Sequence, residues 1–230
     1  MPMLPRIANF DDLDPLRMEP NLRIVLVRPG EPIPSETRLV ILPGSKATIA
    51  DLRFLREQGW DIDIRAHVRR GGAVLGLCGG YQMLGRRILD PAGVEGGGEA
   101  EGLGLLDVET ILEAEKVTSP TSARHIASGE AVHAYEIHLG RSYGPDCERP
   151  LFAIGSRGEG AISTNGRVIG TYLHGLFAAD GFRRAFLKSL GARSAARYEE
   201  RVEGALGALA DHLAEHLDVE RILAIARAGA

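Results

Sequence analysis

The chain has 230 residues, of which 44% are apolar, so it can bury a core of ordinary size, most simply as one domain. Its net charge is −4 with both signs interspersed, which argues against nucleic acid as the main partner. No apolar run approaches the ~20 residues of a membrane span and no signal peptide is recognisable, so we expect no membrane partner and a cytoplasmic location. The two cysteines, Cys78 and Cys147, do not suggest a disulfide, which fits a reducing compartment.

The first part of the chain alternates strand and helix patterns. These occupy residues 22–27 (LRIVLV), 39–42 (LVIL), 48–58, 60–70 and 73–77. Thr48, followed by Asp51 three residues later, resembles the start of a capped helix. The alternation predicts an α/β fold with a mainly parallel sheet covered by helices on both faces, in which sites lie beyond the carboxyl ends of strands. The turn at 43–45 (PGS) and Cys78 are both expected on that edge.

Cys78 lies between an apolar strand pattern and a helical pattern, within the sequence GLCGG. Glycines at 76 and 80 permit the sharp strand-to-helix turn of a nucleophile elbow, which side chains would crowd. The start of a helix favours ionisation of the thiol, and the N–H of Gly79 is aimed where an oxyanion would form. Without these glycines, a buried cysteine packed as a hydrophobe would be the better interpretation. With them, the pattern predicts a nucleophile.

The remainder of the chain is richer in strand and turn signals. Residues 91–101 (PAGVEGGGEAE) lack the lysine and strand context of a phosphate-binding loop, and we interpret them as a flexible surface loop. Strand patterns follow over 103–112, 131–139, 152–154, 161–164 and 168–173. Asn165-Gly166, between the last two, indicates a two-residue hairpin turn. Helical patterns end the chain over 181–190, 195–217 and 219–228, with apolar faces for packing on this domain or on a partner.

Among the seven histidines, His174 is the best candidate for a general base. It ends a strand pattern and precedes a glycine, so it can project from the same edge as Cys78. His212 and His216 have a metal-compatible spacing, but they lack further ligands nearby, and we interpret them as part of a solvated helix face. We therefore expect no metal site.

Three long motifs carry a resemblance to a known family. They are VILPGSKATIADL at 40–52, GLCGGYQMLG at 76–85 and GTYLHGLF at 170–177, and the shorter GLLDVET, EKVT and YEIHLGRS fit with them. Together they resemble the glutamine amidotransferase domain of the class I, triad-type family, and more narrowly its cobyric acid synthase branch. The resemblance covers roughly residues 4–190 and implies the flavodoxin-like fold of that family, with C-terminal helices added.

The resemblance implies a role for each matching residue of the reaction centre. Cys78 is implied as the nucleophile that attacks the side-chain amide of glutamine. His174 is implied as the base that activates the thiol and then protonates the departing ammonia. Gly79 and the Gly44-Ser45 turn are implied as the two sides of the oxyanion hole.

Three further residues are implied as neighbours of the bound glutamine, namely Gln82, Tyr135 and Lys116. The chain also departs from the family pattern at two positions. Leu176 stands where the wider family carries a glutamate two residues after the catalytic histidine, and Ala134 replaces a usual glycine. The cobyric acid synthase branch is likewise a Cys-His dyad, so the group that orients the imidazole stays open.

Whole cobyric acid synthases carry an N-terminal ATP-dependent synthetase domain that amidates carboxylates of the corrin ring, and no P-loop lysine motif occurs here. We expect residues 1–20 to be a connector from that missing domain, 21–190 the amidotransferase domain, and 191–230 C-terminal helices. Glutamine is the implied ligand of this chain, which is expected to need no cofactor. ATP and Mg²⁺ are expected in the synthetase domain or subunit, which carries the corrinoid substrate.

Two other functions stay open at this point. One is a glutaminase for another acceptor, such as a cell-wall lipid precursor, and the short chain favours this alternative because such subunits are free-standing. The other is a catalytically silent docking module that binds a synthetase, which the intact Cys78 and His174 oppose.

Overall fold

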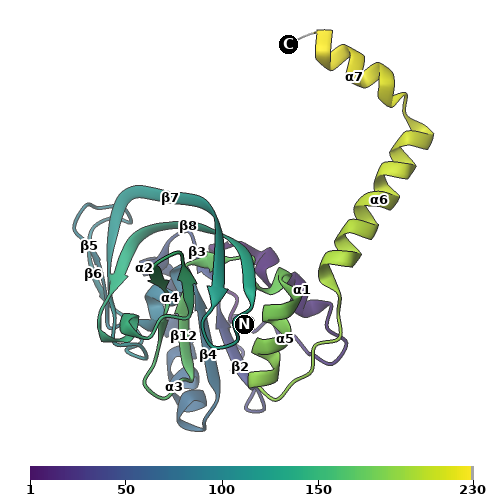
Figure 1. Ribbon diagram of the computed structural model, residues 1–230. Coiled ribbons are helices and arrows are strands. Elements are labelled where there is room, and N and C mark those ends of the chain that lie inside the picture. Colours follow the sequence, from purple (N-terminus) through teal and green to yellow (C-terminus); the bar gives the residue numbers. More distant parts are fainter. Residues whose placement is uncertain (229–230) are drawn as a thin grey trace.

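A computed structural model describes residues 1–228, which contain two main β-sheets, of seven and four strands, and one short two-stranded sheet (Figure 1). The four-stranded sheet has the strand order β11-β12-β4-β2. β2 (Leu39–Leu42), β4 (Ala73–Leu77) and β12 (Val168–Thr171) are parallel, and β11 (Ala161–Ile162) adds an antiparallel edge. Because helices cover a parallel sheet on both faces, its strands are buried on both sides, which explains their almost continuous apolar sequences.

Helices lie on both faces of this sheet, as the sequence predicts. α2 (Thr48–Glu57) and α3 (Trp60–Arg69) contribute to the same core as Val40 of β2. α5 (Asp180–Ser189) contributes to the opposite core, together with Ile41. Successive residues of one strand thus enter different cores, which is the period of two expected for a strand.

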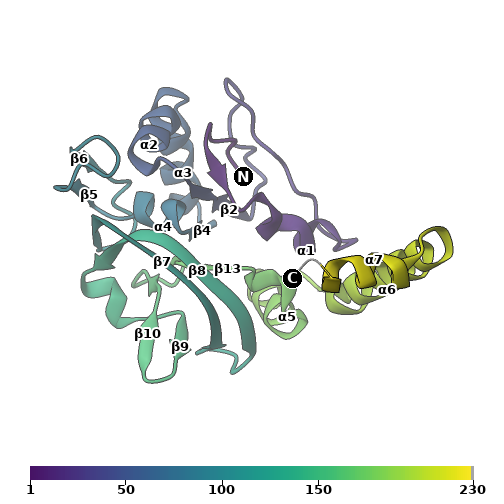
Figure 2. The same ribbon diagram turned by 90° about the horizontal axis from the view of Figure 1, so that it is seen from above.

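The larger sheet is mostly antiparallel and is built around one long ribbon. β7 (Glu109–His125) and β8 (Ala131–Tyr143) form this curved ribbon, with a register shift between Ile111 and Lys116 (Figure 2). The other strands are β5 (Arg87–Asp90), β6 (Gly98–Glu101), β9 (Phe152–Ile154), β10 (Arg157–Glu159) and β13 (Leu173–His174). Because β8 pairs with both β7 and β13, the ribbon lies directly against the strand that carries His174.

Residues 1–20, the predicted connector, pack onto the domain through three short elements. β1 (Ile7–Ala8) pairs antiparallel with β3 (Gly44–Ser45), which follows β2. A 3₁₀ turn, η1 (Phe10–Leu13), and the short helix α1 (Asp14–Arg17) come next. The segment therefore reaches the carboxyl edge of the parallel sheet, where the site is expected.

A buried ion pair fastens this segment to α5. Arg183 Nε donates to Glu19 Oε1 at 2.7 Å, and both side chains are fully buried. Burial acts to raise the pKa of Glu19, but hydrogen bonds from the Ser194 hydroxyl, the Ala195 N–H and Arg183 outweigh it and lower the pKa to about 2. The pair therefore links chain segments that are far apart in the sequence.

Two local predictions are wrong. Residues 22–27 form no strand, and only Val27 makes an isolated parallel bridge, to Pro2. Thr48 does not cap α2. Instead the Glu95 carboxylate accepts the N–H groups of Thr48 and Ile49, both at 2.8 Å, because a negative charge is favourable at a helix N-terminus.

Two loops also differ in detail from expectation. The glycine-rich loop folds around the Asp90 carboxylate, which accepts three backbone N–H groups at 2.7–2.8 Å, those of Val94, Glu95 and Gly97. The turn at Asn165-Gly166 is longer than two residues, because the last paired residues are Ser163 and Val168. Two additional 3₁₀ turns are η2 (Pro145–Glu148) and η3 (Leu176–Ala178).

The C-terminal helices α6 (Tyr198–His216) and α7 (Val219–Ala228) extend away from the rest of the structure (Figure 1). Up to residue 228 they have no buried residue, and they expose an apolar stripe that includes Val202, Leu206, Leu209 and Leu213. Within residues 1–228 they do not pack on this domain. Positions 229 and 230 of the predicted C-terminal segment lie outside the described residues. Within 1–228, no helix is long and apolar enough to span a membrane.

Substitution Glu19→Ala tests the ion pair. It removes one of the two carboxylates paired with the buried Arg183 guanidinium, since Asp180 Oδ1 also lies 2.6 Å from it, and we expect it to lower the free energy of unfolding by up to about 3–5 kcal/mol. Urea denaturation followed by circular dichroism measures this. Glu200→Ala, which removes only the exposed pair with Arg197, is the matched control and leaves the midpoint unchanged. Equal effects of the two substitutions would contradict the role of Glu19.

Candidate active site

Cys78 occupies a strained turn between β4 and α4 (Gly79–Leu84). Its backbone has φ 49° and ψ −109°, a conformation that a non-glycine residue rarely adopts. The surrounding glycines are required by space, because a Cβ atom on Gly80 would lie 2.2 Å from the Leu42 carbonyl oxygen. A Cβ atom on Gly76 would lie 2.6 Å from the Gly80 carbonyl oxygen. The chain therefore forms the elbow that the GLCGG sequence predicts.

His174 ends β13 and is fully buried. Its Nδ1 atom lies 2.6 Å from Oδ2 of Asp12, and Oδ1 of the same carboxylate accepts the Gly175 N–H at 2.7 Å. The carboxylate thus holds both the ring and the backbone that follows it. Because Nδ1–H donates to Asp12, the free lone pair of a neutral imidazole is at Nε2.

The Nε2 atom of His174 is buried and has no hydrogen-bond partner within residues 1–228. Burial acts to lower the pKa of this imidazole, but its contacts with Asp12 and then Cys78 outweigh that effect and raise the pKa from 6.5 to about 9. A base with its free nitrogen beside a thiol, and with an anion behind it, favours the imidazolium that forms when the thiol is deprotonated.

The residues predicted for the oxyanion hole come together beside the elbow. A Cβ atom on Gly79 would lie only 2.8 Å from the Ser45 nitrogen, so the two backbones are in close contact. The Lys46 N–H donates to the backbone carbonyl of Arg6 at 2.9 Å. Because successive residues of an antiparallel strand direct their N–H groups to opposite sides, the Ser45 N–H faces away from β1. Gly44 faces the imidazole, since a Cβ atom there would lie 3.2 Å from Cε1 of His174.

Gln82 is buried one turn after Cys78 and joins three elements. Its Oε1 accepts the Thr48 hydroxyl at 3.0 Å, and its Nε2 donates to the Leu139 carbonyl at 2.8 Å and to the Tyr172 hydroxyl at 3.3 Å. These bonds tie α4 to the start of α2 and to the β8 ribbon. The structure thus gives Gln82 a positioning role beside the nucleophile.

The other two predicted glutamine neighbours lie in different settings. The Tyr135 ring stacks on His174 with ring centroids 5.4 Å apart, and its hydroxyl accepts a hydrogen bond from Asn9 Nδ2 at 2.6 Å. Lys116 is exposed on β7, opposite Leu139. The structure brings Tyr135 to the imidazole and leaves Lys116 on the outer strand of the ribbon.

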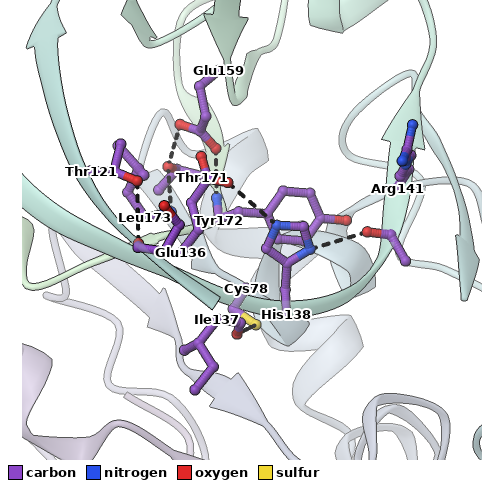
Figure 3. Close-up of polar contacts among 12 residues, drawn as sticks. Cys78, Thr121, Glu136, Ile137, His138, Arg141, Glu159, Thr171, Tyr172 and Leu173 are labelled. Carbon is purple, nitrogen blue, oxygen red and sulfur yellow. Dashed lines mark hydrogen bonds and ion pairs between the residues drawn. The ribbon is translucent and has the colours of Figure 1, made fainter. Parts of the chain in front are cut away.

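The β8 ribbon covers the nucleophile with a buried polar cluster (Figure 3). The Cys78 thiol donates to the Ile137 carbonyl at 3.5 Å, and the His138 ring stacks on Tyr172 with centroids 3.9 Å apart. Burial raises the pKa of Glu159 to about 7, and its carboxyl accepts the Thr171 hydroxyl and the Tyr172 N–H, both at 2.7 Å. The cluster fixes the chain that leads into His174.

Asp12 is the functional residue that sequence reasoning missed. Its segment has no periodicity, and it lies 162 positions from His174. Residues 1–20 are interpreted from the sequence as a connector, and nothing in that segment indicates a contact between Asp12 and the imidazole of His174. His212 and His216 contact each other on α6, and residues 1–228 contain no group of three side chains suited to a metal ion.

Two solved structures share the fold of this chain. PurLQS from Thermotoga maritima aligns with a TM-score of 0.61 and 16% identity, over 82% of this chain and 96% of that one. A crystal structure titled glutamine amidotransferase aligns with a TM-score of 0.55 and 20% identity, over 81% of this chain and 96% of that one. These likenesses establish the fold alone.

The chain belongs to the CobB/CobQ-like glutamine amidotransferase domain family. The sequence model of this family matches residues 1–182. It is 61% identical over 224 residues to cobyric acid synthase of Cereibacter sphaeroides and 62% identical over 226 residues to that of Rhodobacter capsulatus. These alignments cover 96% and 97% of this chain but 47% of each relative, so the chain spans about half the length of the curated relatives it matches.

Substitution Asp12→Asn tests the contact that orients the base. The amide carries no charge, so we expect the pKa of His174 to fall below about 9 and glutamine hydrolysis to slow by about 10²–10⁴-fold, by analogy with other triads. Proton titration of the imidazole by NMR and an ammonia-release assay measure the two effects. Asp11→Asn, one residue away and exposed, is the control. An unchanged rate in Asp12→Asn would contradict the assignment.

The raised pKa also sets the direction of a pH effect. The pKa of His174 is higher in the folded protein than the ordinary 6.5, so the stability that its charged form contributes is complete below pH 6.5. That contribution is lost as the pH rises through about 9. In Asp12→Asn we expect this loss to move to lower pH, which thermal unfolding across pH 6–10 measures.

Proposed function

We propose that the chain is the glutamine-hydrolysing portion of a cobyric acid synthase. One observation supports this proposal most strongly. The strained turn at Cys78 lies at the same sheet edge as the buried His174, whose ring is oriented by Asp12. Identity of 61–62% to cobyric acid synthases supports this branch over a glutaminase for a cell-wall precursor.

The residues support a two-step acyl transfer. His174 Nε2 takes the proton of the Cys78 thiol, and the thiolate attacks the carboxamide carbon of glutamine. The N–H groups of Gly79 and Ser45 are the donors for the oxyanion of the tetrahedral intermediate. Collapse breaks the C–N bond, and His174 gives its proton to the departing ammonia, which leaves a γ-glutamyl thioester.

The second step regenerates the thiol. Water attacks the thioester carbon while His174 accepts its proton, and the C–S bond breaks to release glutamate. His174 then returns the proton to the Cys78 sulfur. Through both steps, the Asp12 carboxylate accepts the Nδ1–H hydrogen bond and stabilises the positively charged ring. Gln82 and Tyr135 position the elbow and the imidazole, respectively.

The remaining half of the reaction belongs to chain outside residues 1–230. We place the ATP and Mg²⁺ requirement and the corrinoid carboxylates in a synthetase portion, which receives the ammonia. The assignment is supported by the length of the relatives, of which this chain covers 47%. Both cysteines are free thiols, which supports a cytoplasmic location.

Covalent labelling tests the proposal directly. We expect a diazoketone analogue of glutamine to form one adduct, on Cys78, and glutamine to protect against it. Cys147 is the internal control, because burial raises the pKa of its thiol and keeps it protonated. Intact mass and peptide mapping measure the site and extent of labelling.

Matched variants complete the labelling test. Cys147→Ala keeps the adduct, and Cys78→Ala abolishes it. In His174→Ala the adduct forms far more slowly, because the thiol loses its base. Equal labelling of both cysteines would favour a silent docking module, and full ammonia release by Cys78→Ser would exclude Cys78 as the nucleophile.

A further inference from the structure

An apolar cavity of about 820 Å³ lies at the edge of the parallel sheet. Residues 22–25 form one wall and Leu39–Ile41 of β2 form the other. Leu187 and Leu190, at the end of α5, line a third side, and Met1 lies at the boundary. The chain's N-terminus lies beside β2 in both views (Figures 1 and 2).

One wall of the cavity is a sheet edge, β2, and the other is the non-strand run 22–25, and both have backbone groups without a hydrogen-bond partner in the described part of the chain. β2 pairs with β4 on one side only within residues 1–228. The Ala73 N–H donates to the backbone carbonyl of Arg38. Because alternate residues of a strand in a parallel ladder bond to opposite sides, the backbone N–H and C=O of Ile41 face away from β4, toward the cavity. The N–H groups of Ile41 and Val25 both lack a backbone partner within residues 1–228. Ile41 is buried and Val25 is half-buried, and backbone groups that are removed from water are nearly always paired.

A short ladder already points the way into the cavity. Met1 nitrogen donates to the Val25 carbonyl at 2.8 Å, the Val27 N–H donates to Met1 at 2.9 Å, and the Met3 N–H donates to Val27 at 2.9 Å. Pro2 and Val27 form a parallel bridge. If the chain continued in the same way for two residues before Met1, the second of them would accept the Val25 N–H and donate its own N–H to the Arg23 carbonyl.

We propose that this cavity is the seat of a central β-strand, formed by the residues that directly precede Met1 in a longer polypeptide. The strand lies between residues 22–27 and β2, and it completes the order in which the first strand of a flavodoxin-like sheet is central. This inference rests on the proposed function only for the identity of the longer chain, since the relatives are about twice as long.

The seat also defines the chemistry of its occupant. β2 has four residues, so a strand of about four residues, roughly 13 Å long, matches it. Both faces of the sheet are buried here, with Val40 and Ile41 in opposite cores, so both faces of the occupant must be apolar. Burial also lowers the pKa of the Met1 ammonium to about 6, whereas a peptide bond at this position carries no charge.

Filling the seat has a consequence for the site. The occupant is continuous with residues 3–12, which include β1 and end at Asp12. A strand anchored between two neighbours fixes the start of this segment, and Asp12 in turn orients His174. The run at 22–27, which the sequence predicts as a strand, gains the partner that makes it one.

Three four-residue extensions before residue 1 test the proposal. Ile-Val-Ile-Val supplies an apolar strand, Ile-Val-Pro-Val has similar hydrophobicity but lacks the N–H that pairs with Arg23, and Gly-Ser-Gly-Ser controls for length. We expect exchange of the Val25 and Ile41 amides to slow by about tenfold or more with Ile-Val-Ile-Val, the effect of one net hydrogen bond. The two controls exchange like the unextended chain. Amide-resolved hydrogen exchange by NMR measures this.

Two results would overturn the proposal. One is equal exchange at Val25 and Ile41 in all three extended chains. The other is concentration-dependent protection in the unextended chain together with a dimer in sedimentation, because a second copy then occupies the edge. The exchange measurement needs neither glutamine nor ammonia release, so its failure is distinct from a failure of the glutaminase assignment.

Discussion

The Asp12 carboxylate, buried against His174, is the contact on which the rest of the site depends. Burial alone would lower the pKa of the imidazole and favour its neutral form, and the Asp12 carboxylate at Nδ1 is the first of the two contacts that reverse this effect, before Cys78. The same carboxylate binds the Gly175 N–H, so ring orientation and backbone position are set together. A neighbouring nucleophile then needs no further partner to be activated, because the proton has a defined destination at Nε2.

The scaffold divides its tasks between two sheets. The parallel sheet carries the strained turn at Cys78, and close packing of Gly80 against Leu42 excludes alternative side chains there. The antiparallel ribbon of β7 and β8 covers the nucleophile and fixes the position of His174, since β13 pairs with β8 and places His174 opposite Tyr135. Gln82 connects the two through Leu139. Strain at the elbow is thus held by contacts from every side, as expected where a sparsely populated backbone conformation persists.

Sequence reasoning succeeded where the signal is local and failed where it depends on distant partners. The elbow at Cys78 follows from glycine spacing within five residues, and the helical and strand periods predicted the layers. Asp12 has no such signal, because its partner is 162 positions away. Thr48 was predicted as a cap because its spacing to Asp51 is right, yet Glu95 reaches the same amides from another loop. At Asp12 and at Thr48 the physical origin is the same, since a contact between distant segments takes the place of a local one.

The run at 22–27 illustrates the reverse case, in which local sequence is right and the partner is lacking. Its β-branched residues have the composition of an inner strand, but a strand exists only when its N–H and C=O groups are paired. With pairing limited to residues 1–3, the run lies open beside an apolar cavity. The carboxylate that orients the base is carried by the segment that leaves this edge. The residues that would complete the sheet are therefore continuous with the segment that carries Asp12. A strand added at this edge would act on the orientation of His174 through this backbone, without the movement of a domain.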